Sequence, residues 1–163
     1  LYLLPAVVVG IIAFYFFNLH TQNEENRRKY LLHRENLKHA LPLRLQAYER
    51  MALFLERIAP GNLLVRVKPV SDKKESYANL LIKTIEQEFE HNLAQQIYVS
   101  EECWNVIKAS KNATITRIRK TAGNEELNNA SEFRQQILNS MIEQAPPSET
   151  GLSYIKKEVS NLW

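Results

Sequence analysis

The chain has few of the residues on which catalytic and metal-binding sites are commonly built. Its 163 residues include one Cys, Cys103, and one Asp, Asp72. A single Cys excludes an intrachain disulfide, and it lies in EECWNV beside two acids, which raise a thiol pKa. Asp72 could serve a Ser-His-Asp triad, but the sequence contains no nucleophile elbow. The four Gly are isolated from one another, which excludes a Gly-rich phosphate loop. We therefore predict that Cys103 is a small core residue and that the protein is not an enzyme.

The low content of Gly and Pro indicates an all-α fold. Only 4 Gly and 6 Pro occur, and the segments between them are rich in Glu, Lys, Gln, Leu and Asn. Apolar stripes at helical spacing predict helices after Pro60 over about 73–95, 101–122, 130–144 and 148–162. Ser100 and Ser148 are the expected N-caps of the second and the last of these helices. VRVKPV alternates like a strand, but Pro69 argues against a sheet, so the stretch that follows Pro60-Gly61 is expected to be a connector.

An apolar segment, LYLLPAVVVGIIAFYFF, opens the chain and contains no charge. At 1.5 Å per residue it spans about 26 Å, slightly less than the roughly 30 Å hydrocarbon core of a bilayer. The chain does not begin with Met, and we expect upstream residues to complete the span. The segment lacks the basic start and cleavage site of a signal peptide and the polar face of an interfacial helix. It predicts a transmembrane helix over residues 1–18.

The chain becomes polar after the apolar segment. Residues 19–59 are expected to form a juxtamembrane stalk and an amphipathic helix. Arg27, Arg28 and Lys29 lie close enough to the span to count in the positive-inside rule, and they are predicted to meet lipid headgroups. The rule places residues 60–163, the helical bundle, in the cytoplasm. Pro42 removes a helical hydrogen bond, so we predict a kink or a fresh helix start near Leu41.

The most regular apolar stripe lies in LPLRLQAYERMALFLERIAP. Its members recur every three or four residues: Leu41, Leu45, Tyr48, Ala52 and Leu55. Such a stripe packs either on the chain's own helices or on a partner helix, and both alternatives stay open. If it meets a partner, these five residues are the candidate interface.

Two further groups of residues are candidate sites. Glu88 and His91 share a helix face, but a di-iron bundle needs a second such pair, so no metal or cofactor is predicted. The stretch 103–124 carries five basic residues and no acid. Cations near the C-terminus of a helix are favoured by the helix dipole, and they could also contact anionic lipid; either explains these five residues. No RNA-binding motif is present, so nucleic acid is not an expected partner.

Two long runs of the chain support a resemblance. HALPLRLQAYERMALFLERIAPGNLLVRV and IEQEFEHNLAQQIYVSEECWNVI resemble a family of uncharacterised single-pass membrane proteins of Bacteroidota bacteria. The resemblance covers most of the chain and implies a bacterial inner membrane. It carries over no catalytic or binding residues.

These observations favour a non-enzymatic accessory or scaffold subunit of the inner membrane. Its cytoplasmic bundle is expected to dock on a larger membrane complex, for example a transport, secretion or motility assembly, and a homo- or hetero-oligomer is left open. The alternatives are a lipid-binding or regulatory module at the cytoplasmic membrane surface, and a tethered enzyme that uses Glu88 and His91.

Overall fold

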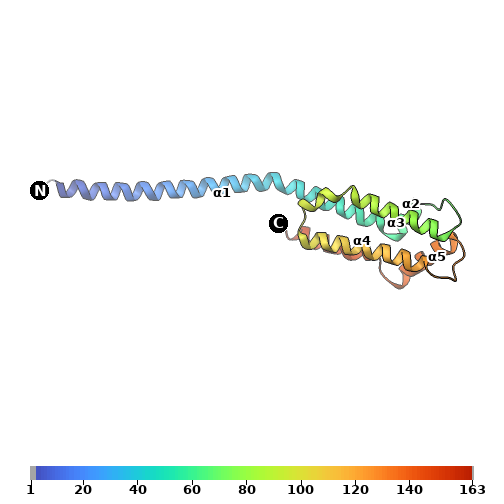
Figure 1. Ribbon diagram of the computed structural model, residues 1–163. Helices are drawn as coiled ribbons and strands as arrows, with labels where there is room; N and C mark the ends of the chain where they lie inside the picture. The colour runs from blue at the N-terminus through green and yellow to red at the C-terminus, as the bar shows by residue number, and fades with distance from the viewer. Residues whose placement is uncertain (1–2, 163) are drawn as a thin grey trace. The chain divides into compact units, whose positions relative to one another are not determined.

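The described residues form an all-α structure (Figure 1). This computed structural model describes the backbone of residues 3–162, and the side chains of that range except 3–6, 11, 33, 34 and 36–39. Residues 3–162 contain no strand, and the prediction of an all-α fold is confirmed. The helices are α1 (Leu3–Ile58), α2 (Pro60–Arg66), α3 (Lys74–Glu90), the 3₁₀ helix η1 (Leu93–Ile97), α4 (Glu101–Ala122), α5 (Ala130–Glu143) and α6 (Pro147–Ser160).

Helix α1 continues through Pro42, so of the two predicted alternatives near Leu41 the fresh helix start is wrong and the kink stays a prediction. The turns on both sides of Pro42 are α-helical. A proline inside a helix removes one hydrogen bond and costs about 3 kcal/mol. The chain divides into two compact units, residues 1–42 and 43–163.

The core of the second unit is built by the last turns of α1 together with the helices that follow. The predicted helices after Pro60 are confirmed as α3, α4, α5 and α6, except that α3 ends at Glu90 and not near residue 95, because the chain turns there and continues as η1. The largest fully buried side chains come from α1 to α5: Tyr48, Met51, Phe54, Leu55, Ile58, Leu63, Leu64, Tyr77, Leu81, Ile85, Ile107 and Phe133. Because α1 supplies five of these side chains, residues 43–58 are part of the bundle and not only its attachment.

The short helix α2 was missed by the sequence prediction of a connector. Pro60 occupies its first turn, where a proline has no hydrogen bond to lose and its fixed φ suits a helix. Leu63 and Leu64 of α2 are each only 1% exposed. Pro60 therefore ends one helix and starts the next, and α2 covers part of the core.

The two predicted N-caps differ in outcome. Ser100 is confirmed as the N-cap of α4, because its Oγ accepts a hydrogen bond from the Cys103 amide at 3.0 Å. Ser148 is wrong as the N-cap of α6, because Pro146 holds that position and Ser148 is fully buried in the first turn. Its Oγ makes no hydrogen bond with any described residue. The two prolines shift the start of α6 so that Pro147 stands at the first helical position.

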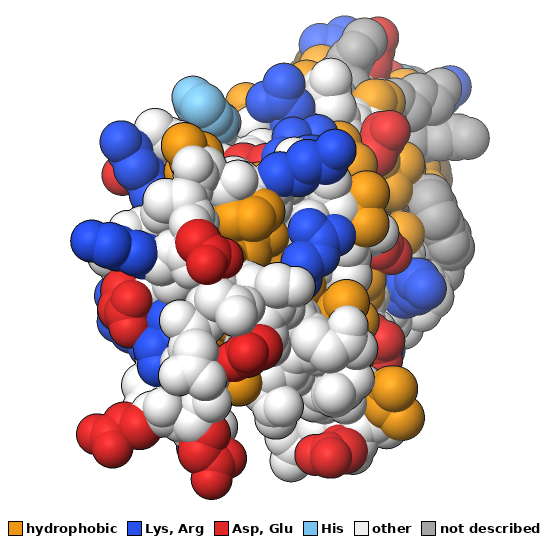
Figure 2. Space-filling view, turned by 90° about the vertical axis from the view of Figure 1, so that its right-hand side faces the viewer, with side chains coloured by type: hydrophobic (Ala, Val, Ile, Leu, Met, Phe, Trp, Pro, Cys, Tyr) orange, Lys and Arg blue, Asp and Glu red, His pale blue; other side chains and the backbone are white. Residues whose placement is uncertain are grey.

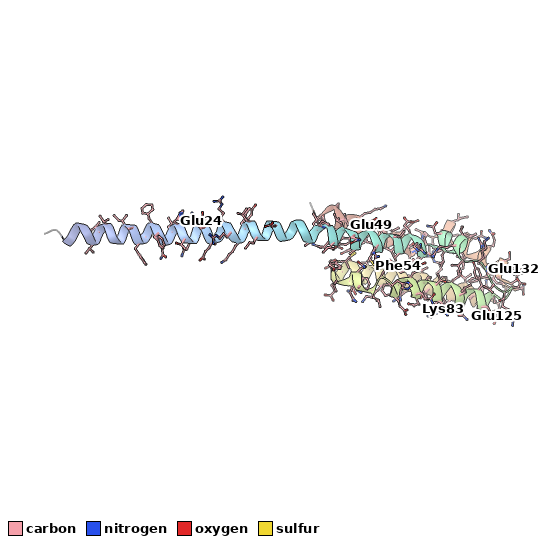
Figure 3. All side chains as sticks on the ribbon, turned by 90° about the horizontal axis from the view of Figure 1, so that it is seen from above. Glu24, Glu49, Phe54, Lys83, Glu125 and Glu132 are labelled. Carbon is pink, nitrogen blue, oxygen red and sulfur yellow. The ribbon has the colours of Figure 1, made fainter. Side chains whose placement is uncertain are left out.

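Aromatic side chains join α1, α3 and α4 inside the bundle. The Phe89 ring packs against Phe54 with 5.6 Å between centroids, and it stacks on Trp104 at 5.2 Å. In Figure 3, Phe54 lies between α1 and the neighbouring helices. The Lys111 ammonium sits 4.6 Å from the centroid of Phe89. Such offset aromatic contacts add about 0.5–1.5 kcal/mol each to the burial of the rings, so this row fixes how the three helices meet.

Helix α6 approaches α1 and α4 closely at Gly151. A Cβ added to Gly151 would lie 2.8 Å from Leu55 Cδ1 and 2.9 Å from Ser110 Oγ. Both neighbours are buried, so neither side chain can move aside without disturbing the core.

We expect Gly151→Ala to lower the free energy of unfolding by about 1–3 kcal/mol, because the added methyl overpacks this contact. Gly61→Ala is the control, since a Cβ there meets only Met141 Cε at 3.5 Å. Its stability should stay within about 0.5 kcal/mol of the parent. Urea unfolding followed by circular dichroism and tryptophan fluorescence measures both, and equal stability of the two variants would contradict this packing.

Candidate functional site

The first candidate surface is a band of exposed apolar side chains on α1, here called the apolar collar (residues 7–19). Its large members are 49–72% exposed: Val7, Val8, Val9, Ile12, Phe14, Tyr15, Phe16, Phe17 and Leu19. Because successive helical residues are about 100° apart, these positions cover every side of the helix. Figure 3 shows side chains projecting from opposite sides of this part of α1. A helix that is apolar all round is stable only when something covers it.

The predicted span over residues 1–18 includes side chains that lie outside the described residues. Within the part that the structure does describe, no helix has the length and apolar character needed to cross a membrane.

The predicted headgroup residues Arg27, Arg28 and Lys29 are exposed on α1. Arg27 pairs with Glu24 at 3.7 Å, and the two side chains are 71% and 44% exposed. An exposed pair of this kind contributes about 0–1 kcal/mol and releases its charges easily. The three cations are therefore accessible to an anionic surface.

The five stripe residues do not share one environment. Tyr48 and Leu55 are 1% and 0% exposed in the bundle's own core, so these two side chains are not free to meet a partner helix. Ala52 is half-buried and packs against the core, Leu45 is half-buried, and Leu41 belongs to the first unit. Part of the stripe thus packs on the chain's own helices, and a partner-helix interface at its other residues stays a prediction. The sequence did not single out Leu53, which is 57% exposed on the opposite face.

A buried polar cluster surrounds Cys103 where α1, α4 and α6 meet. Tyr48 donates a hydrogen bond to Glu158 Oε1 at 2.8 Å, and Arg44 donates to Tyr48 at 3.4 Å. Burial, together with the nearby Glu158 carboxylate, raises the pKa of the Cys103 thiol to about 12. The thiol is fully buried and protonated at neutral pH, so it is a core residue and not a nucleophile.

Glu158 is held by this cluster without complete pairing. Partial burial alone would raise the pKa of Glu158, but the polar groups of Ser100, Tyr48 and Cys103 beside it, together with the Arg44 charge, outweigh this effect, and the pKa is lowered. Its Oε2 is buried and has no partner of good hydrogen-bond geometry among the described residues. The carboxylate is thus a structural anion between three helices.

Glu88, a candidate site residue from the sequence, binds two guanidinium groups. Arg57 donates to both carboxylate oxygens, at 2.8 and 3.0 Å, and Arg66 donates to Oε1 as well. Arg50 and His91 border the same hollow of about 280 Å³. The Glu88 side chain is 15% exposed, and both of its carboxylate oxygens accept hydrogen bonds. Among the described residues no group of three or more His, Cys, Asp or Glu could hold a metal ion.

The five basic residues of α4 are used in different ways. Lys111 forms an ion pair with Glu86 at 2.8 Å, and Lys108 and Arg119 are exposed. Arg117 and Lys120 line a groove of about 610 Å³ between α4 and α5. The series is therefore not one continuous basic face.

One end of the bundle shows no dominant charge. Figure 2 views this end, where side chains of both signs are interspersed and hydrophobic side chains form only small separate patches. Nothing on this face suggests a partner of one charge or an apolar docking groove.

Comparison with known proteins places the chain in a family. The model of a family of unknown function (DUF7935) matches residues 1–162. The chain belongs to this family. Its members' shared sequence thus extends over both units, including the apolar collar and the bundle. No curated protein and no solved structure matches the chain.

The Glu88 cluster predicts a defined dependence of stability on pH. Partial burial alone would raise the pKa of Glu88, but the hydrogen bonds and charges of Arg57 and Arg66 outweigh it and lower the pKa below its ordinary 4.5. A carboxyl whose folded pKa is lowered stabilises the fold above its unfolded pKa and loses that contribution as the pH falls through the folded pKa.

We expect Glu88→Gln to lower the free energy of unfolding at pH 7 by about 1–2 kcal/mol, because two guanidinium groups lose their counter-charge. As the pH falls below 4.5, the parent should approach the variant. Glu90→Gln removes an exposed acid from the same helix and should cost at most about 0.5 kcal/mol at pH 7. Parallel loss of stability in parent and Glu88→Gln on acidification, measured by urea unfolding, would refute the role of Glu88.

Proposed function

We propose that this protein is a non-enzymatic accessory or scaffold subunit attached to a bacterial inner membrane. The apolar collar anchors it, the bundle lies in the cytoplasm, and the bundle docks on a larger membrane complex such as a transport, secretion or motility assembly. A homo- or hetero-oligomer fits this proposal equally well.

The apolar collar is the observation that carries the proposal. Fully burying one large apolar side chain is worth about 1.5–3 kcal/mol, and nine such side chains are exposed on the collar. Exposed apolar surfaces of this size mark interaction sites, and a lipid environment covers all sides of a helix at once.

The non-enzymatic part of the proposal is supported by how the reactive groups are used. Cys103 is buried with a raised pKa, Glu88 is bound by two arginines, and Glu158 is held by its neighbours. These groups stabilise the fold instead of facing a substrate. His91 borders a hollow of about 280 Å³, and the acid in that hollow, Glu88, is paired with Arg57 and Arg66.

Orientation and docking rest on residues beyond the collar. Arg27, Arg28 and Lys29 follow it, and the positive-inside rule assigns them to the cytoplasm. The bundle exposes several large apolar side chains, which supply contact points for a partner: Leu43, Leu53, Val65, Val70, Leu93, Ile97 and Ile142.

Purification of the tagged chain from its host's membranes in mild detergent tests this proposal. We expect the parent to be recovered from the membrane fraction with a stoichiometric membrane-protein partner. Phe14→Glu/Phe17→Glu should leave the membrane fraction, because each charge in the hydrocarbon costs about 2.5–3.5 kcal/mol. Leu31→Glu/Leu32→Glu, on the same helix beyond the collar, should behave like the parent. A parent chain found in the soluble fraction would contradict anchoring, and a solitary chain in the membrane would contradict docking.

The second candidate function is an anionic-lipid-binding or regulatory module at the membrane surface. It is favoured by Arg27, Arg28 and Lys29, which are exposed and only weakly paired. Each cation near an anionic surface contributes about 1 kcal/mol.

For this alternative, Arg27→Gln/Arg28→Gln/Lys29→Gln should weaken binding to phosphatidylglycerol vesicles by about 3 kcal/mol, roughly a hundredfold, at low salt. The difference should shrink as salt screens the charges. Lys68→Gln/Lys73→Gln/Lys83→Gln removes three exposed cations of the bundle and is the matched control. Vesicle flotation reports both, and equal losses in the two variants, or binding that ignores lipid charge, would exclude headgroup recognition by residues 27–29.

A further inference from the structure

A groove of about 610 Å³ lies between α4 and α5. Helix α4 lines one wall with Thr116, Arg117 and Lys120, and α5 lines the other with Gln136, Ser140 and Gln144. The two helices pack against each other and are joined by residues 123–129 (Figure 1). Two cations thus face a wall of uncharged polar side chains.

The groove offers more hydrogen-bond donors than the chain itself uses. Arg117 donates two hydrogen bonds to Gln144, to the side-chain Oε1 at 3.1 Å and to the main-chain carbonyl at 3.4 Å. A guanidinium has five N–H groups, so three are left over. Lys120 makes no ion pair within the described residues. Its ammonium adds three donors.

The other charges near the groove do not neutralise these cations. None of the residues that line it is acidic, and residues 103–124 contain no acid at all. Gln144 holds the Arg117 guanidinium in place before any ligand arrives, which reduces the entropy lost on binding. A donor-rich groove with two cations and no acid is matched chemically by an oxyanion.

We propose that this groove binds a phosphate monoester carried on a small polar body. Arg117 and Lys120 contact the phosphate oxygens, and the amide and hydroxyl groups of Gln136, Ser140 and Thr116 meet the hydroxyl groups of the rest of the ligand. The ligand is a free phosphate ester or the headgroup of a lipid. The site is independent of the proposed scaffold function, which makes no use of this groove.

Titration of the full chain in neutral detergent micelles with glycerol phosphate tests the site by ¹H–¹⁵N NMR. We expect saturable shifts at the amides of the groove residues. Arg117→Gln/Lys120→Gln should weaken binding by about tenfold or more, because charge-assisted hydrogen bonds are lost. Lys108→Gln/Arg119→Gln removes the same charge from the same helix outside the groove and should bind like the parent. Circular dichroism confirms that each variant is folded.

The outcomes separate the proposal from nonspecific charge effects. Shifts that fail to saturate at tens of millimolar ligand, or that weaken equally in both double variants, would overturn it. A second titration uses short-chain phosphatidic acid below its micelle concentration. Binding tighter than that of glycerol phosphate assigns the site to a lipid headgroup, and equal binding assigns it to a free phosphate ester.

Discussion

The structure depends on the packing of residues 47–58 of α1 into the core formed with α3, α4 and α6. The Phe54 ring packs against Phe89, which in turn stacks on Trp104. The Leu55 side chain lies next to Gly151, where α6 comes closest to α1. The same helix carries the apolar collar, whose side chains find no cover within the first unit. One part of α1 is therefore buried by the chain itself, and the side chains of another part are exposed.

The ionisable groups of the bundle connect its helices more than they offer chemistry. Glu158 of α6 accepts a hydrogen bond from Tyr48 of α1. Glu88 of α3 accepts hydrogen bonds from Arg57 of α1 and Arg66 of α2. Removing one partner of such a group leaves a charge without its counter-ion, which costs more than the pair contributes in net terms. Glu158 and Glu88 thus stabilise the packing of the helices that they join.

Local sequence patterns predicted the parts of this fold that local physics determines. The apolar stripes predicted α3 to α6, and Ser100 was predicted as the N-cap of α4. The start of α2 at Pro60 was missed, and at Pro42 a kink and a fresh helix start were both left open, because the pattern of one segment does not determine whether a proline interrupts a helix. The Glu88 cluster and the groove of Arg117 and Lys120 join residues more than 20 positions apart, and no spacing within one helix predicts such neighbours.

Photo-crosslinking from position 14 of the apolar collar, in the membranes of the host, tests the central claim most directly. A photoreactive phenylalanine analogue replaces Phe14, and the same analogue at Leu31 is the reference. Anchoring predicts adducts with lipid from position 14 and few or none from position 31. Adducts from position 14 that contain only soluble proteins, or only a second copy of this chain, would show that another apolar surface covers the collar and would contradict membrane attachment.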